Sequence, residues 1–264
     1  MKIKLNTIIF FSLLLIMVVT FFTRNSYRGV DSVAPEVLLQ PIQEELVGPN
    51  IISFTKDDYK YTVSPLYVYE ISGLIVHRLD YTWFSIYKKD SVFPLDLCMM
   101  WGNDVERGIY KSRDLSFRQD SRFCWWQWSG KLNVNNSEIS NSHLVIDNKD
   151  IEAKLKDLNE GDQVKITGFL SNIDAINTGD PGEYDPPEFS LQTSTTRDDS
   201  GPGACEIIYV TGIEILKKGN PISVWLFLLS KYGLAIFFAV NFLMFVYNET
   251  LAKRWAEKPN FEIE

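Results

Sequence analysis

Two long apolar runs lie near the two ends of the chain. Residues 5–22 contain no charged side chain, and residues 224–247 contain a single one, Lys231. An 18-residue helix extends about 27 Å, which is close to the hydrocarbon thickness of a bilayer. We therefore predict a transmembrane anchor at 1–22 and a second transmembrane helix at 222–248. A cleaved signal peptide is the alternative for the first run, but no small-residue cleavage pattern follows it.

Basic residues at the outer ends of both runs indicate the topology. Lys2 and Lys4 precede the first run, and Lys253 and Arg254 follow the second. Positive flanks favour the cytoplasm, although basic residues on the inner side of each run weaken the bias. Two spans would then place both termini in the cytoplasm, the second as a short tail at 249–264.

Between the two runs, a polar, proline-bearing segment at 23–50 is interpreted as a tether, and an extracytoplasmic domain is expected at 51–220. Most apolar stretches of this domain are short and rich in β-branched and aromatic residues, which is typical of strands. The stretch 149–158 instead spaces its apolar residues as a helix does. We expect strands over 67–78, 82–87, 95–102, 122–134, 163–170 and 205–216.

The order of these elements narrows the fold class. Several strands, one helix and then two more strands is the order of an OB-fold-like barrel. A small β-sandwich with one helix would produce a similar pattern. The expected fold is therefore mostly β, either an OB-like barrel or a small β-sandwich with one helix, together with two transmembrane helices.

Charge and motif content exclude several classes of function. The chain carries a net charge of −8, and residues 23–220 contain 20 Lys and Arg against 30 Asp and Glu. A general nucleic-acid binder would need a basic face, so no nucleic-acid partner is expected. The sequence has no C-x-x-C, H-E-x-x-H, G-x-x-x-x-G-K-[ST] or G-x-G-x-x-G motif, so we expect neither a metal nor a cofactor.

Three cysteines lie in the outer segment, at Cys98, Cys124 and Cys205. In an oxidising compartment a disulfide is favoured and one thiol remains. Cys98 and Cys124 both fall in expected strands, and we favour that pair, although three pairings are possible. Cys205 would then be free.

Cys205 is the residue around which catalytic chemistry is conceivable. With His143 as base and a carboxylate such as Asp199 or Glu206 nearby, its thiol could act as a nucleophile. Arg197 or Asn141 would then orient the substrate or stabilise an oxyanion. The alternative is that Cys205 is a small buried residue at the head of a strand, that Arg197 and Asp199 form a structural ion pair, and that His143 satisfies a backbone group.

Five segments together resemble a family of uncharacterised bacterial membrane-anchored or exported proteins. They are 94–102, 121–128, 139–145, 158–170 and 194–210, and the most specific part is a Ser-x-x-Arg-x-Asp-x-Gly-x-Gly-Ala-Cys-Glu motif. This chain matches it at Ser194, Arg197, Asp199, Gly201, Gly203, Ala204, Cys205 and Glu206. The family pattern also includes Pro94, Asp96, Trp101, Gly102, Arg122, Asn141 and His143.

The resemblance implies a bacterial envelope protein and a set of marked residues, but no reaction. Cys98 and Cys124 are not part of the family pattern. Two departures of this kind fit a pair of cysteines added together as a local disulfide. The marked residues expected to bind a ligand are Asp96, Trp101, Arg122, Asn141, Ser194 and Glu206.

Two functions remain open from the sequence. The first is a bacterial inner-membrane protein that displays a periplasmic OB-like binding or assembly module, with the lipid bilayer and another envelope protein as partners. The second is a cysteine-dependent hydrolase or transferase that uses Cys205 and His143.

Overall fold

The computed structural model describes residues 5–48, 50–82, 85–120, 122–179, 185–197, 199 and 203–256, with side chains to 251. Gly201 of the motif and the part of the expected tail beyond residue 256 lie outside these residues. The chain divides into two compact units, one made of the two terminal segments and the other of Asn25–Asn220. Each unit is described by itself.

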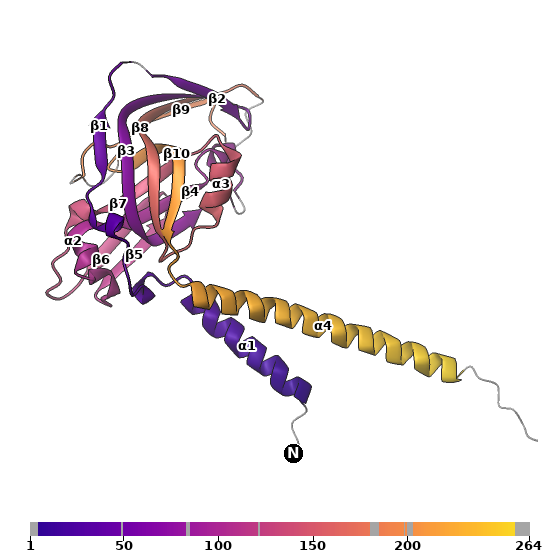
Figure 1. Cartoon of the computed structure of the whole chain (residues 1–264). Helices are drawn as coiled ribbons and strands as arrows, with labels where there is room; N and C mark the ends of the chain where they lie inside the picture. The colour runs from indigo at the N-terminus through magenta and orange to yellow at the C-terminus, as the bar shows by residue number, and fades with distance from the viewer. Residues whose placement is uncertain are drawn as a thin grey trace, which may run out of the picture. The chain divides into compact units, whose positions relative to one another are not determined.

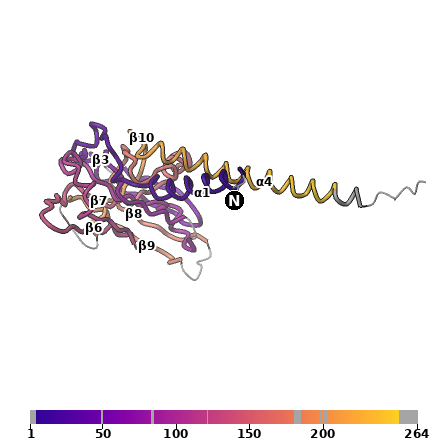
Figure 2. The backbone as a smooth tube through the Cα atoms, turned by 90° about the horizontal axis from the view of Figure 1, so that it is seen from below, coloured from indigo at the N-terminus to yellow at the C-terminus, as the bar shows by residue number. Residues whose placement is uncertain are grey.

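The terminal unit consists of two helices, α1 (Leu5–Thr23) and α4 (Pro221–Ala256). Both are long and apolar enough to cross a membrane, over 19 residues in α1 and 31 in α4. The end of α1 lies beside the start of α4, where the Thr23 hydroxyl donates to Ser223 Oγ at 3.1 Å, and α4 extends well beyond α1 (Figure 1 and Figure 2). The two apolar runs therefore form the helices that the sequence predicts.

The central unit is built around a closed barrel of five strands. Strand β3 (Tyr59–Asp80) pairs with both β4 (Leu95–Met100) and β8 (Gln163–Asn177), which closes the circuit β3-β4-β7-β10-β8. Among the strand pairs of the described residues, β7 (Ile139–Val145) and β10 (Glu206–Lys217) form the one parallel pair. Helix α3 (Lys149–Lys156) connects β7 to β8 (Figure 1). The β3–β8 pairing makes the fold a barrel rather than a sandwich.

Shorter elements surround this barrel. The strands β1 (Ile42–Glu45) and β2 (Ile52–Lys56) pair with β3, and β9 (Glu188–Leu191) pairs with β8. Between β4 and β7 the chain forms the short helix α2 (Gly102–Glu106) and a separate hairpin of β5 (Leu115–Asp120) and β6 (Phe123–Trp128). Turns of 3-10 helix occur at Tyr27–Gly29, Pro35–Leu38, Lys88–Ser91, Ile109–Lys111 and Asn136–Glu138.

Side-chain alternation along β4 creates two different faces. Leu95, Leu97 and Met99 are buried in the barrel interior. The intervening residues face outward, where Cys98 packs in a second apolar cluster with residues of the hairpin. A disulfide joins Cys98 to Cys124 of β6, with 5.9 Å between their Cα atoms. A cross-link over 26 residues contributes about 3 kcal/mol of stability and attaches the hairpin to the outer face of the barrel.

Residues 25–48 are not the free tether that the sequence predicts. Val30 and Val37 are buried, and the backbone of Ala34 donates to Gln163 Oε1 at 2.6 Å. Strand β1 extends the sheet, with Ile42 opposite Glu70. The prolines that indicated a linker instead shape a segment whose few apolar residues cover the barrel.

Candidate functional site

The outer face of the barrel carries a buried acid–base pair. Asp96 of β4 and His143 of β7 stand opposite each other in the strand register, and their neighbours Leu95 and Leu144 fill the interior. His143 Nδ1 lies 2.9 Å from Asp96 Oδ1, and Asp96 is fully buried. Adjacent antiparallel strands therefore create this contact between residues 47 positions apart in the sequence.

Arg122 provides a second cation for Asp96. It belongs to the two-residue turn between β5 and β6 and has φ of 68°, a conformation that favours glycine or asparagine in such hairpins. Its guanidinium lies 3.4 Å from Asp96 Oδ1, forms an ion pair with Asp90, and stacks 3.9 Å from the ring centre of Tyr81. Arg122 therefore makes these contacts from a backbone conformation that arginine rarely adopts.

His143 is positively charged at neutral pH in this environment. Burial by itself lowers the pKa of His143, but the Asp96 carboxylate and, to a smaller extent, Cys205 raise it to about 9. The Cys205 side chain lies close enough to the same imidazole to raise its pKa. The acid, the imidazole and the thiol thus form one line of contacts.

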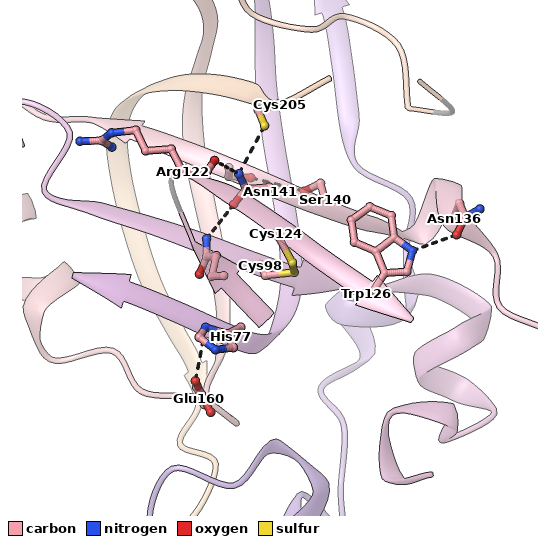
Figure 3. The surroundings of a disulfide bond; sticks show 12 residues. His77, Cys98, Arg122, Cys124, Trp126, Asn136, Ser140, Asn141, Glu160 and Cys205 are labelled. Atoms are coloured by element: carbon pink, nitrogen blue, oxygen red, sulfur yellow. Dashed lines mark hydrogen bonds and ion pairs between the residues drawn. A yellow bond between two sulfur atoms is a disulfide. The ribbon is translucent and has the colours of Figure 1, made fainter. Parts of the chain in front are cut away.

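Asn141 lies next to this line on β7. Its amide Nδ2 donates to Cys205 Sγ at 3.3 Å and to the Arg122 carbonyl at 2.8 Å, while its Oδ1 accepts from Gln119 at 2.7 Å (Figure 3). Each bond comes from a different strand or loop. Asn141 is therefore held in one orientation, with an N–H aimed at the sulfur.

Cys205 lines a cavity and is partly exposed. The cavity has a volume of about 340 Å³ and lies where the parallel strands β7 and β10 begin. Its wall combines aromatic side chains of β6 with polar side chains of the barrel, among them Phe123, Trp126, Asn141, Arg197, Cys205 and Glu206. The thiol is therefore open to a small molecule on one side and in contact with the base on the other.

Glu206 and Arg197 lie on another wall of the cavity. Glu206 is 5% exposed, and burial raises its pKa to about 8, against the smaller lowering effects of a backbone hydrogen bond, Arg197 and His143. Arg197 donates weakly to Tyr69 Oη at 3.5 Å and to the Pro41 carbonyl at 3.4 Å. These residues form a polar subsite separate from the His143 contact.

Ser194 and Asp199 organise the loop before β10. Ser194 Oγ donates to Asp199 Oδ2 at 2.6 Å, and the Ser194 backbone N–H donates to the Cys205 carbonyl at 3.0 Å. Asp199 lines the cavity but is exposed. The expected ion pair between Arg197 and Asp199 is absent from the ion pairs of the described residues, because Asp199 bonds to hydroxyl groups instead.

Two sequence-based assignments are corrected by the structure. Trp101 is fully buried in the barrel core and donates to Gln40 Oε1 at 3.2 Å, so it supports the fold and does not bind a ligand. The carboxylate in contact with His143 is Asp96 rather than Asp199 or Glu206, because strand pairing and not sequence proximity determines the neighbour.

The sequence provided no signal for Tyr81, Asp90 or Gln119. The first two lie in the connection between β3 and β4, and Gln119 lies in the hairpin. None belongs to a motif, and each reaches the site only through packing of its element on the outer face. An alternation analysis of β5 would have placed Gln119 on the same face as Phe117, which is directed at the barrel.

Among the residues described, no group of three or more His, Cys, Asp and Glu side chains is arranged to hold a metal ion. Comparisons with protein-family models, with curated protein sequences and with solved structures found no match to this chain. The geometry of the site is therefore the basis on which a function can be inferred.

Proposed function

We propose that this protein is a membrane-anchored, cysteine-dependent hydrolase or transferase in which Cys205 is the nucleophile. One observation carries the proposal: Cys205 contacts His143, His143 contacts Asp96, and Cys205 opens into a cavity. A nucleophile, a base and a group that orients the base are the parts that covalent catalysis requires.

The reaction that fits this arrangement is acyl transfer. The Cys205 thiolate, whose proton is held by His143 as the imidazolium, attacks a carbonyl carbon and a C–S bond forms. The bond to the leaving group then breaks as His143 donates its proton to that group. Water or another acceptor then attacks the thioester, its proton passes to His143, and the thiolate of Cys205 is released. The positive charge of His143 at neutral pH supports its role as the proton donor in the first step.

Asn141 and Arg122 have supporting roles in this proposal. The Asn141 N–H, which is 3.3 Å from the sulfur, is placed to donate to an oxyanion on a carbon bonded to that sulfur. Arg122 is a positioning residue, since it contacts Asp96 and reaches Cys205 only through other groups. No cofactor is needed for either step.

A second candidate function is a binding or assembly module that uses the same cavity without covalent chemistry. The barrel has the strand number and the helix position of an OB-like fold, in which the face of the second and third strands and two adjoining loops bind ligands. Here those strands are β4 and β7, and the cavity adjoins β7 and the loop before β10. An envelope protein would then be the partner, and nucleic acid is disfavoured by the acidic charge.

We further propose a bacterial inner-membrane location with the barrel in the periplasm and both termini in the cytoplasm. The two apolar helices, the basic terminal flanks and the Cys98–Cys124 disulfide support it, because disulfides persist in oxidising compartments. A reporter fused after Glu264 should be active only in the cytoplasm. A reporter active in the periplasm contradicts this orientation.

Acylation of the detergent-solubilised full chain by p-nitrophenyl acetate tests the catalytic proposal. We expect a burst of one p-nitrophenolate per chain and an acetyl group on Cys205 by mass spectrometry, and neither in Cys205→Ala. His143→Gln should slow the burst by 10²–10⁴-fold. Acetylation that is absent, or equally fast in His143→Gln, overturns the proposal in favour of the binding module.

Matched carboxylate variants distinguish the role of Asp96 from a general effect of charge. Asp96→Asn should slow acylation by about 100-fold or more, because His143 loses the group that orients it. Asp90→Asn removes a carboxylate that contacts the same Arg122 but leaves the His143 contact in place. Its acylation rate should stay within a few-fold of the unmodified protein.

A further inference from the structure

The two chain connections of the central unit meet at one point on its surface. Ser26 lies three residues after the end of α1, and Asn220 directly precedes α4. The Asn220 amide Nδ2 donates to the Ser26 carbonyl at 2.8 Å. Because three residues of extended chain span at most about 11 Å, this point stays close to the end of α1 in any arrangement of the two units. The surface around it is therefore the part of the central unit nearest to a bilayer that α1 crosses.

The open end of the β5–β6 hairpin, where Leu115 pairs with Trp128, lies at this surface. The Tyr27 ring contacts Phe117 edge-on, with 5.7 Å between the ring centres. The Arg28 guanidinium donates to the Leu115 carbonyl at 2.7 Å. The end of the hairpin away from its turn is thus held beside the residues that follow α1.

Aromatic side chains gather at the open end of the hairpin. Phe117 and Trp128 are diagonal neighbours on one face of the two paired strands, and Tyr27 adds a third ring. Trp128 is 42% exposed, so much of a large apolar side chain is left in contact with solvent. Trp125 is 51% exposed as well, but it lies nearer the turn and lines the cavity of Cys205. Tryptophan and tyrosine are enriched at the surfaces of bilayers, where their amphipathic rings suit the headgroup layer.

The hairpin and its flanks are basic within an acidic domain. Residues 107–131 contain six Lys and Arg against two Asp and Glu, whereas residues 23–220 contain 20 against 30. Arg113 and Lys131 flank the open end and are exposed, and neither belongs to an ion pair of the described residues. An exposed tryptophan beside such basic side chains matches a surface of anionic lipid headgroups.

We propose that the open end of the β5–β6 hairpin lies in the headgroup layer of an anionic bilayer, with Trp128 at the boundary of the acyl chains and Arg113 and Lys131 beside lipid phosphates. The proposal rests on the membrane location proposed above and adds a second contact with the same membrane. Because the Cys98–Cys124 disulfide attaches the hairpin to the barrel, this contact holds the barrel in one orientation on the membrane surface.

Spin labelling of the full chain in nanodiscs of phosphatidylcholine and phosphatidylglycerol tests the proposal. One label is attached through Ser129→Cys, at an exposed position beside Trp128. Glu188→Cys on β9 carries the aqueous reference label, because β9 pairs with the end of β8 that lies away from Gln163 and the connection to α4. Both variants also contain Cys205→Ser, so that each chain has one free thiol.

Collisions of each label with a water-soluble nickel complex and with oxygen, which concentrates in lipid, measure its surroundings. We expect a several-fold loss of nickel collisions at Ser129 relative to Glu188, and a gain of oxygen collisions. Equal values at the two positions overturn the proposal and leave the surface available to a protein partner. A third label, at Phe238→Cys on the exposed surface of α4, separates the two proposals. An aqueous label at Ser129 with a lipid-exposed label at Phe238 contradicts the hairpin contact alone, whereas aqueous labels at both contradict the membrane location as well.

Variants of the hairpin assign the contact to its charge and to one ring. Arg113→Gln combined with Lys131→Gln should lower the ratio of docked to undocked hairpin by about 25-fold, because each basic residue near an anionic surface contributes about 5-fold. Nickel collisions at Ser129 should then return to the aqueous value, and omission of phosphatidylglycerol should act in the same direction. Trp128→Ser should also increase them, whereas the matched control Trp125→Ser should not. Equal effects of the two tryptophan variants, or no effect of the charge variant, contradict the proposal.

Discussion

Two buried carboxyl groups, Asp96 and Glu206, belong to the same site but have different surroundings. Asp96 is fully buried between the cationic side chains of His143 and Arg122, which both approach its Oδ1. Glu206 is almost equally buried, and each acid has one oxygen without a hydrogen-bond partner among the described residues, but the ion pairs of those residues include Asp96 and not Glu206. The charge of one acid is balanced by cationic side chains, and the other acid is kept neutral by burial.

The difference shows how environment assigns roles to chemically similar groups. An ionised acid beside a histidine orients the imidazole and stabilises its positive charge. An acid that burial keeps protonated near pH 7 is instead neutral in the folded protein and can donate a hydrogen bond. A buried acid with a shifted pKa that lines a cavity is typical of functional sites, although structural ion-pair networks shift pKa values as well.

The largest expected effect comes from removing the paired acid. Asp96→Asn leaves His143 and Arg122 without their shared counter-charge, so the free energy of unfolding should fall by about 3–5 kcal/mol. Chemical denaturation of the solubilised chain at pH 7 measures it. The free energy of unfolding of Glu206→Gln should fall by no more than about 1 kcal/mol under the same conditions. Equal losses in the two variants would contradict the different roles assigned to the two acids.

A smaller effect should appear as a pH dependence that involves Glu206 alone. Its pKa is raised from 4.5 to about 8, so between these values the unfolded chain holds the ionised form and the folded protein the protonated form. Stability from this group is present at low pH and decreases as pH rises. From pH 5 to 7, the unmodified protein should lose about 3 kcal/mol relative to Glu206→Gln, or about 1.4 kcal/mol per pH unit.

The comparison with Glu206→Gln matters because His143 also titrates, and its contribution is common to both proteins. Parallel stability curves for the two proteins over this range would mean that Glu206 is not held protonated by the fold. The same denaturation assay, repeated at four or five pH values, provides the curves.

The smallest effect is expected for the exposed acid of the cavity. Asp199→Asn removes acceptors of the Ser194 and Thr196 hydroxyls, but the amide oxygen still accepts a hydrogen bond and the group is in contact with solvent. The free energy of unfolding should change by less than about 0.5 kcal/mol. A loss similar to that of Asp96→Asn would place Asp199 in the buried network instead.

Local pattern predicted many elements of this protein. The uncharged run at 5–22 forms α1, and the run at 224–247, which contains one charged residue, lies in α4. Long apolar runs of this kind favour helices. The stretch 149–158 contains α3, since its apolar spacing matches a helical turn. The prediction of a tether at 23–50 was wrong, because proline content does not show that Val30 and Val37 pack against the barrel.

The candidate site divides in the same way. Residue types indicated Cys205 and His143 as a possible pair, and Arg197, Asn141 and Glu206 as members of the same group. Their arrangement, and the choice of Asp96 as the partner of His143, depended on strand register. Trp101 was predicted to bind a ligand but lies in the core. Its sequence neighbours do not distinguish a core tryptophan from a ligand-binding one.

The sequence by itself determined that the chain has two membrane-length apolar helices, an acidic β-rich segment between them and a small set of chemically capable side chains. These properties follow from composition and from short-range periodicity. Only the tertiary structure decided that β3 pairs with β8 to close a barrel, that Arg122 and His143 share Asp96, and that Glu206 is buried beside the cavity. Long-range strand pairing determines all three, because it brings together residues that local sequence cannot relate.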